Sequence, residues 1–219
     1  MNGNSNNGDK VTFQMMFWLF IIGSLIGFFL EGIWHIMRKG SWESHPATVW
    51  GPFCIIYGFG AVLLYLVSIP LKNKLPIVRF LVYAFVGGAV EYVGSLFQEL
   101  AFGTVSWDYS GHFLNIGGRV SLKMTALWGL LGLLFFKYLF PAFTQLLCRI
   151  DGTVWNVACI ILAIFMAVDL AVTSCALIRW RARQNDDMPD NAAECFLDEH
   201  FSDAFMEKRF PNMHFKANT

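Results

Sequence analysis

The sequence predicts an all-α fold: a polytopic membrane helical bundle of about five transmembrane helices, followed by a short soluble amphipathic C-terminal tail. Two observations predict it. Hydrophobic residues make up 56% of the 219 residues and charged residues only 15%, with a mean hydropathy of +0.49, whereas soluble domains contain about 25% charged residues. The apolar residues also gather in long runs, and about 20 such residues in a helix span a bilayer. A chain this short could not bury so much apolar surface in a single core in water, and lipid removes that problem.

Five apolar runs are the candidate membrane spans. The second is the shortest, and Gly51-Pro52 at its start permits an irregular, tilted or partly re-entrant beginning. A tight link at residues 70–74 predicts that the second and third spans are antiparallel neighbours. The five spans cover residues 11–37, 53–69, 77–100, 120–140 and 153–178.

The composition divides the chain into three parts. Residues 1–10 are expected to be a flexible polar N-terminus, residues 11–179 the transmembrane helical bundle, and residues 180–219 a soluble C-terminal tail with one amphipathic helix. Asp190 or Asn191 is the expected N-cap of that helix. The tail is acidic, so an anionic membrane surface would repel it. A contact with another protein, or with the bundle itself, is expected instead.

Basic residues give the expected orientation. Three arginines directly follow the last span, and such residues favour the cytoplasmic side. The chain is therefore expected to be a multi-pass protein of the inner, or cytoplasmic, cell membrane with its C-terminus in the cytoplasm. The basic residues between the second and third spans favour the opposite orientation. The two sets are Arg179, Arg181 and Arg183, and Lys72, Lys74 and Arg79.

Three carboxylates inside the apolar spans are the strongest functional signal: Glu31, Glu91 and Asp169. An ionisable group is costly at the bilayer centre and usually faces protein or a water-filled cavity. His35 lies one turn after Glu31 on the same helix face, so the two side chains could form a hydrogen bond. This pair is either a structural contact or a proton-linked or substrate-binding group.

A polar stripe continues from Glu91 along its predicted helix. Ser95 and Gln98 follow at spacings of four and seven residues, which places them on the same face. The preceding Gly87-Gly88 permits a close approach of another helix. The stripe predicts either a lined cavity or a tight polar helix interface.

The loop of residues 107–119 is rich in chemically capable side chains. Asp108, His112, Asn115 and Arg119 could line an entrance, or the loop could be a hydrogen-bonded cap over the bundle. Arg119 is a candidate ion-pair partner for any of the three carboxylates in the spans.

Several function classes lack sequence support. The five cysteines lie far apart without a C-x-x-C pair, and no H-E-x-x-H motif occurs, so neither a metal nor a cofactor is expected. The net charge is zero, which gives no nucleic-acid footprint. No catalytic residue is assigned, because no nucleophile motif stands out. The chain also lacks the G-x-x-x-x-G-K-[ST] loop that binds nucleotide phosphates.

An ordered set of short motifs resembles a known family. The motifs are Glu31-Gly32 with Trp34, the run from Gly51 to Gly60, Glu91-Tyr92 with Ser95, Trp107-Asp108-Tyr109-Ser110, Asn115 with Gly118-Arg119, and Leu127-Trp128-Gly129. Over residues 13–178 the chain is similar to the ABC-transporter permeases called type IV or CmpB-like, which are small bacterial membrane proteins. The resemblance implies a transmembrane subunit that works with a separate cytoplasmic ATPase in a lipid bilayer. A homodimer would be needed to form a pathway.

Two other function classes stay open. Carboxylate and histidine groups could perform acid–base chemistry while Arg119 holds a phosphate, which would suit a membrane-embedded enzyme acting on a lipid or envelope precursor. Alternatively, the Phe-rich face of the tail helix suits a groove on a partner, as in a membrane scaffold or regulator.

Overall fold

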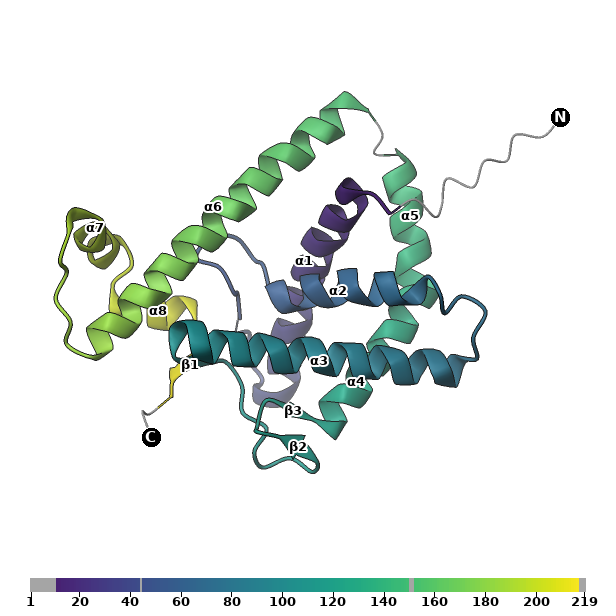
Figure 1. The fold of residues 1–219 in the computed structure, drawn as a ribbon, viewed down its shortest axis with the longest axis horizontal. Helices are drawn as coiled ribbons and strands as arrows, with labels where there is room; N and C mark the ends of the chain where they lie inside the picture. The colour runs from purple at the N-terminus through teal and green to yellow at the C-terminus, as the bar shows by residue number, and fades with distance from the viewer. Residues whose placement is uncertain (1–10, 44, 150–151, 217–219) are drawn as a thin grey trace.

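The computed structural model describes residues 11–43, 45–149 and 152–216, so the expected flexible N-terminus lies outside the described residues. The fold is mainly helical, with only four two-residue strands in the described part (Figure 1), which confirms the predicted all-α membrane bundle. The helices are α1 (Phe13–Lys39), α2 (Ile55–Ser68), α3 (Pro76–Phe102), α4 (Leu122–Leu134), the π-helical turn η2 (Phe135–Leu139), α5 (Phe140–Arg149), α6 (Thr153–Gln184), α7 (Ala192–His200) and α8 (Asp203–Arg209). The short strands are β1 (Thr104–Val105), β2 (Asn115–Ile116), β3 (Val120–Ser121) and β4 (His214–Phe215).

Four helical stretches in the described part of the chain are long and apolar enough to cross a membrane. They are α1, α3, the continuous stretch Leu122–Phe143 that joins α4 to η2 and α5, and α6. The second predicted span is different. With 14 residues, α2 is about 21 Å long, which is short of the roughly 30 Å of a bilayer core.

Small residues bring α1 and α2 into contact. A Cβ atom at Gly23 would lie 2.8 Å from the Ala61 Cβ, and one at Gly27 would lie 2.3 Å from the Tyr57 ring. Residue numbers rise along α2 as they fall along α1, so the two helices are antiparallel. Glycines at such contacts allow backbones to approach closely, as is common between membrane helices.

The chain between α1 and α2 returns along α1 before α2 begins. α1 ends at Gly40, whose positive φ of 75° turns the backbone. Residues 45–54, which we call the returning segment, then reach the middle of α1, where the Cys54 amide donates to the Ser24 carbonyl at 3.1 Å. Because α2 starts only at that depth, it can cover only the N-terminal half of α1. The start of α2 is therefore preceded by irregular backbone, as Gly51-Pro52 permits.

The tail differs from the expected single amphipathic helix, because α7 and α8 are separate. The Phe201 carbonyl accepts a hydrogen bond from Arg183 at 2.8 Å, and Ser202 caps α8 through the Phe205 amide. The boundary expected at residue 179 also moves, since α6 continues to Gln184. Asn191 is the N-cap of α7, one of the two expected residues.

The tail docks on the bundle of its own chain. Its core contains Phe201, Met206 and Phe210, which pack against Trp180 of α6 and Val49 of the returning segment. β4 pairs with β1, beyond the end of α3. In Figure 1, α7, α8 and β1 lie beside the C-terminal end of α6. Of the two protein contacts expected for the tail, the structure therefore has the contact with its own bundle.

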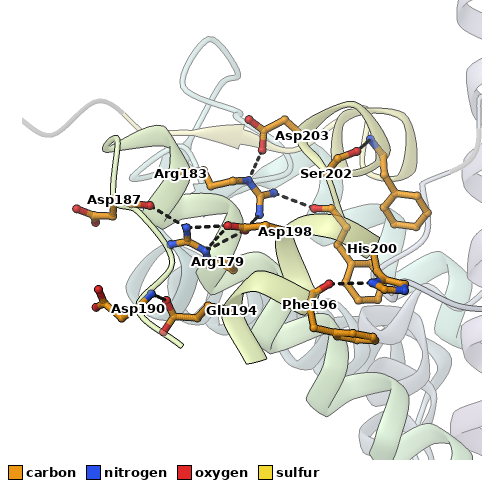
Figure 2. A network of polar contacts seen from close by, with 12 residues as sticks. Arg179, Arg183, Asp187, Asp190, Glu194, Phe196, Asp198, His200, Ser202 and Asp203 are labelled. Carbon is orange, nitrogen blue, oxygen red and sulfur yellow. Dashed lines mark hydrogen bonds and ion pairs between the residues drawn. The ribbon is translucent and has the colours of Figure 1, made fainter. Parts of the chain in front are cut away.

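Ion pairs fasten α7 and α8 to α6. Figure 2 shows Arg179 and Arg183 of α6 converging on Asp198 of α7. Arg179 Nη2 lies 2.8 Å from Asp198, and Arg183 Nε lies 2.6 Å from Asp203. These contacts explain why α6 stays helical beyond the predicted end, since both arginines project from its last turns.

Candidate functional site

Glu31 of α1 faces the returning segment and α2. Its Oε1 accepts a hydrogen bond of 2.5 Å from the Tyr57 hydroxyl, and its Oε2 lies 3.7 Å from His45 Nδ1. Nε2 of the same imidazole lies 2.9 Å from Glu43 Oε1. The carboxylate of Glu31 raises the pKa of His45 most, and that of Glu43 raises it further, although partial burial opposes the shift. The His45 imidazole therefore lies between the two carboxylates.

His35 does not form the predicted hydrogen bond with Glu31. Its Nδ1 lies 2.8 Å from the Ser41 carbonyl, and its Nε2 lies 3.4 Å from Glu43. The turn at Gly40 brings these residues back against α1, so the ring has nearer partners than the carboxylate one turn earlier. The partner of Glu31 is instead His45, which comes from the returning segment.

Glu91 of α3 is buried beneath the loop that follows α3. The Tyr109 hydroxyl donates to its Oε1 at 2.9 Å, and the Trp128 indole of α4 adjoins the same carboxylate. Its Oε2 is buried and has no hydrogen-bond partner among the described residues. Only 7% of the Glu91 surface is exposed.

Aromatic rings connect the two carboxylates. The Tyr57 and Trp128 rings are 5.4 Å apart, and Glu31 and Glu91 are close enough for their charges to interact. Two glycines make room for Trp128, because a Cβ atom at Gly60 or Gly87 would lie within 2.7 Å of its side chain. We call this group the interior network: Glu31, His45, Tyr57, Glu91, Tyr109 and Trp128.

Arg119 is not the partner of any carboxylate in the interior network. Its Nη1 lies 2.6 Å from Glu99 Oε2 and 3.4 Å from Ser95 Oγ. Lys216 of the tail binds the other Glu99 oxygen at 2.9 Å. The expectation that Arg119 pairs with Glu31, Glu91 or Asp169 is therefore wrong. Glu99 lies at the end of α3, nearer to the loop, and its hydrogen bond raises the pKa of Arg119.

Asp169 of α6 lies apart from the interior network and holds the returning segment. Its Oδ1 accepts from the Trp50 amide at 3.1 Å, and Thr173 one turn later accepts from the Val49 amide at 2.9 Å. From the other side, Arg209 of α8 donates to the carbonyls of Thr48 and Gly51. These bonds satisfy backbone groups that would otherwise be unpaired in an apolar surrounding.

The remaining predicted residues build the loop between α3 and α4. Asp108 accepts from the Ser110 amide at 2.8 Å, and Asn115 donates to the Ser110 and His112 carbonyls. Gln98 bonds to Ser106 at 2.8 Å. These contacts favour the hydrogen-bonded cap over an open entrance. The cap carries Tyr109 onto Glu91.

One protein family matches the chain. Its sequence pattern, described as "Putative ABC-transporter type IV", covers residues 18–174. The chain belongs to this family. No curated protein and no solved structure matches it. The family match includes the whole interior network but ends before the tail, which begins after α6.

Sequence reasoning found Glu31 and Glu91 but missed the residues that join them. Tyr57, Tyr109 and Trp128 all lie within the motifs that carry the family resemblance, so those motifs were a usable signal. His45 lies outside them, and only the turn after α1 brings it to Glu31. In the described part of the chain, no group of three His, Cys, Asp or Glu residues is arranged to hold a metal ion.

Proposed function

We propose that the chain is the membrane-spanning permease subunit of an ABC-type transporter in the cell membrane, working with a separate cytoplasmic ATPase. Family membership supports the transporter setting. The chain has no nucleotide-binding loop of its own, so the ATPase is a second polypeptide. In this proposal, the interior network lies on the substrate pathway.

One observation carries the proposal: the irregular backbone of the returning segment runs along α1 from its middle to the half-buried carboxylate of Glu31, which adjoins the buried carboxylate of Glu91. Non-helical backbone at membrane depth is tolerated where protein buries it or where it lines a water-filled cavity. Transporters use such interrupted segments to form substrate sites near the bilayer midplane. The returning segment brings His45 to Glu31, and Asp169 has the role of positioning this segment.

Basic residues support a cytoplasmic C-terminus. The C-terminal ends of α1, α3 and α6 lie together with the tail. Most described Lys and Arg residues occur at this end of the molecule. Because basic residues accumulate on the cytoplasmic side, the ATPase would meet the bundle here. The residues at this end are Arg38, Lys39, Arg119, Lys123, Arg179, Arg181, Arg183, Lys208, Arg209 and Lys216, against Lys72, Lys74, Arg79, Lys137 and Arg149 at the other.

A homodimer is part of the proposal. One copy has four long helices and the short α2 in its described part, which gives few walls for a pathway. α3 also carries large apolar side chains that its own chain leaves exposed. They include Leu81, Phe85, Val93 and Phe97, which could contact lipid or a second copy.

The two alternative functions lose support from the contacts. An enzyme that holds a phosphate with Arg119 would need that guanidinium free, and it is paired with Glu99. A scaffold that binds partners through the tail's apolar face would lose Phe201, which is buried against α6 and the returning segment, and would retain only Phe196 and Phe205 as exposed phenylalanines of that face.

Purification from the native membrane tests the proposal. The tagged chain, isolated in mild detergent, should carry a cytoplasmic ATPase in a fixed ratio by mass spectrometry. A protein recovered only by itself, or as a homo-oligomer, would contradict the permease assignment. A matched purification of an unrelated membrane protein with the same tag controls for adventitious ATPases.

A further inference from the structure

The buried Oε2 atom of Glu91 has no hydrogen-bond partner of normal geometry among the described residues, although the Trp128 indole lies close to the same carboxylate. Native proteins rarely leave such an atom unpaired, and each case calls for an explanation. Only 7% of the Glu91 surface is exposed. A ligand that carries a positive charge or donates a hydrogen bond would satisfy this oxygen, whereas a proton alone would turn it into a donor that still lacks a partner.

The charges around Glu91 favour a positive ligand. The charged group that acts on Glu91 most directly is another carboxylate, Glu31. His45 faces Glu31 and Glu43. Arg119 is paired with Glu99. The interior network therefore has two carboxylates against one imidazole.

We infer that Glu91 and the rings of Tyr57, Tyr109 and Trp128 form a binding site for an organic ammonium cation. The inference rests on the proposed function and names the substrate class of that pathway. Aromatic faces attract ammonium groups, and a carboxylate adds charge. A hard metal ion would instead need several oxygen ligands, and no group of three acidic, His or Cys residues among those described is arranged for one.

Tyr109 closes this site. It belongs to the cap, which its own hydrogen bonds hold together: the Tyr109 amide binds the Gly118 carbonyl at 2.7 Å, and Trp107 Nε1 binds the Arg119 carbonyl at 2.9 Å. The Tyr109 hydroxyl connects this unit to Glu91. Breaking that bond lets the Tyr109 ring move away and gives access to Oε2, while the Arg119–Glu99 ion pair still holds the cap on α3.

Carbodiimide modification of the purified chain tests the site. A hydrophobic carbodiimide reacts with protonated buried carboxyl groups, and mass spectrometry reads the extent at Glu91. Tetramethylammonium chloride should slow the modification, while sodium chloride at the same ionic strength should not. Equal modification in both salts, or no modification of Glu91 in any condition, would overturn the inference.

Two matched pairs of variants test the rings. Tyr109→Phe should speed the modification roughly tenfold, because one hydrogen bond to a carboxylate is lost. Tyr138→Phe, which removes an exposed hydroxyl from η2, should have no effect. Trp128→Phe should weaken protection by tetramethylammonium several-fold, because Trp is the strongest cation–π partner, whereas Trp155→Phe should not. If the members of either pair behave alike, the role of that ring is wrong.

The test separates the inference from the proposed function. It uses the chain alone, so it does not depend on an ATPase. An ATPase that co-purifies while ammonium fails to protect Glu91 would keep the permease and remove the substrate class. Protection without an ATPase would keep the ammonium site and remove the permease.

Discussion

At the residue scale, a few contacts explain how carboxylates persist among apolar helices. Tyr57 gives Glu31 a direct hydrogen bond, and Tyr109 does the same for Glu91. Each tyrosine depends on its neighbours for position. Tyr57 packs against Gly27, where its Cβ, Cγ and Cδ2 atoms occupy the space that a side chain would need. The small size of residue 27 is therefore part of the site.

Gly27→Ala should destabilise the protein by about 1–3 kcal/mol, the usual cost of overpacking. The added Cβ would lie 2.3–2.5 Å from the Tyr57 side chain, so the Tyr57 ring must shift away from Glu31. Thermal unfolding in detergent, followed by gel filtration, measures the effect as a lower Tm. Gly111→Ala is the matched control, since nothing lies within 4 Å of its Cβ position. Equal Tm values for both variants would show that Tyr57 is not tightly packed.

At the element scale, the returning segment and the tail stabilise each other. Asp169 and Thr173 of α6 hold one side of the segment, and Arg209 of α8 holds its backbone carbonyls. The tail in turn depends on the pairing of Arg179 with Asp198, at 2.8 Å. The hydrogen bond from Arg179 is the main reason that the pKa of Asp198 is lowered. The stability from this pair is thus present above the unfolded-state pKa of about 4 and is lost as pH falls through the lower folded-state pKa.

Asp198→Asn should release α7 and α8 from the end of α6. Arg179 would keep its bond to the Asp187 carbonyl but lose its charged partner, so amide hydrogen exchange in residues 192–209 should become about tenfold faster. Glu199→Gln, an exposed carboxylate on the same helix, is the matched control. In the wild type, the protection of these amides from hydrogen exchange, corrected for the intrinsic exchange rate, should be the same at pH 7 and pH 5, because both values lie above the unfolded-state pKa of Asp198. Loss of protection already at pH 5 would contradict the role of Asp198.

At the scale of the whole molecule, hydropathy predicts the helical bundle, because lipid-facing helices need long apolar runs. It also places Glu31 and Glu91 correctly inside those runs. Periodicity along one helix could not show that His45 replaces His35 beside Glu31, since this depends on how the chain turns at Gly40. The pairing of Arg119 with Glu99 likewise depends on the path of the cap. The division of the tail helix follows from a tertiary contact, the hydrogen bond from Arg183 to the Phe201 carbonyl.

The central claim is that the returning segment lines a polar site inside the bundle, and the most direct measurement is water access in the native membrane. Single cysteines would replace His45 or Ile33 in a variant without the native cysteines and react with a small charged methanethiosulfonate. Ile33 lies on α1 two residues after Glu31, and 50% of its surface is exposed on the outside of the bundle of apolar helices. The account predicts modification at position 45 and none at position 33. No modification at position 45, or equal modification at both positions, would contradict it.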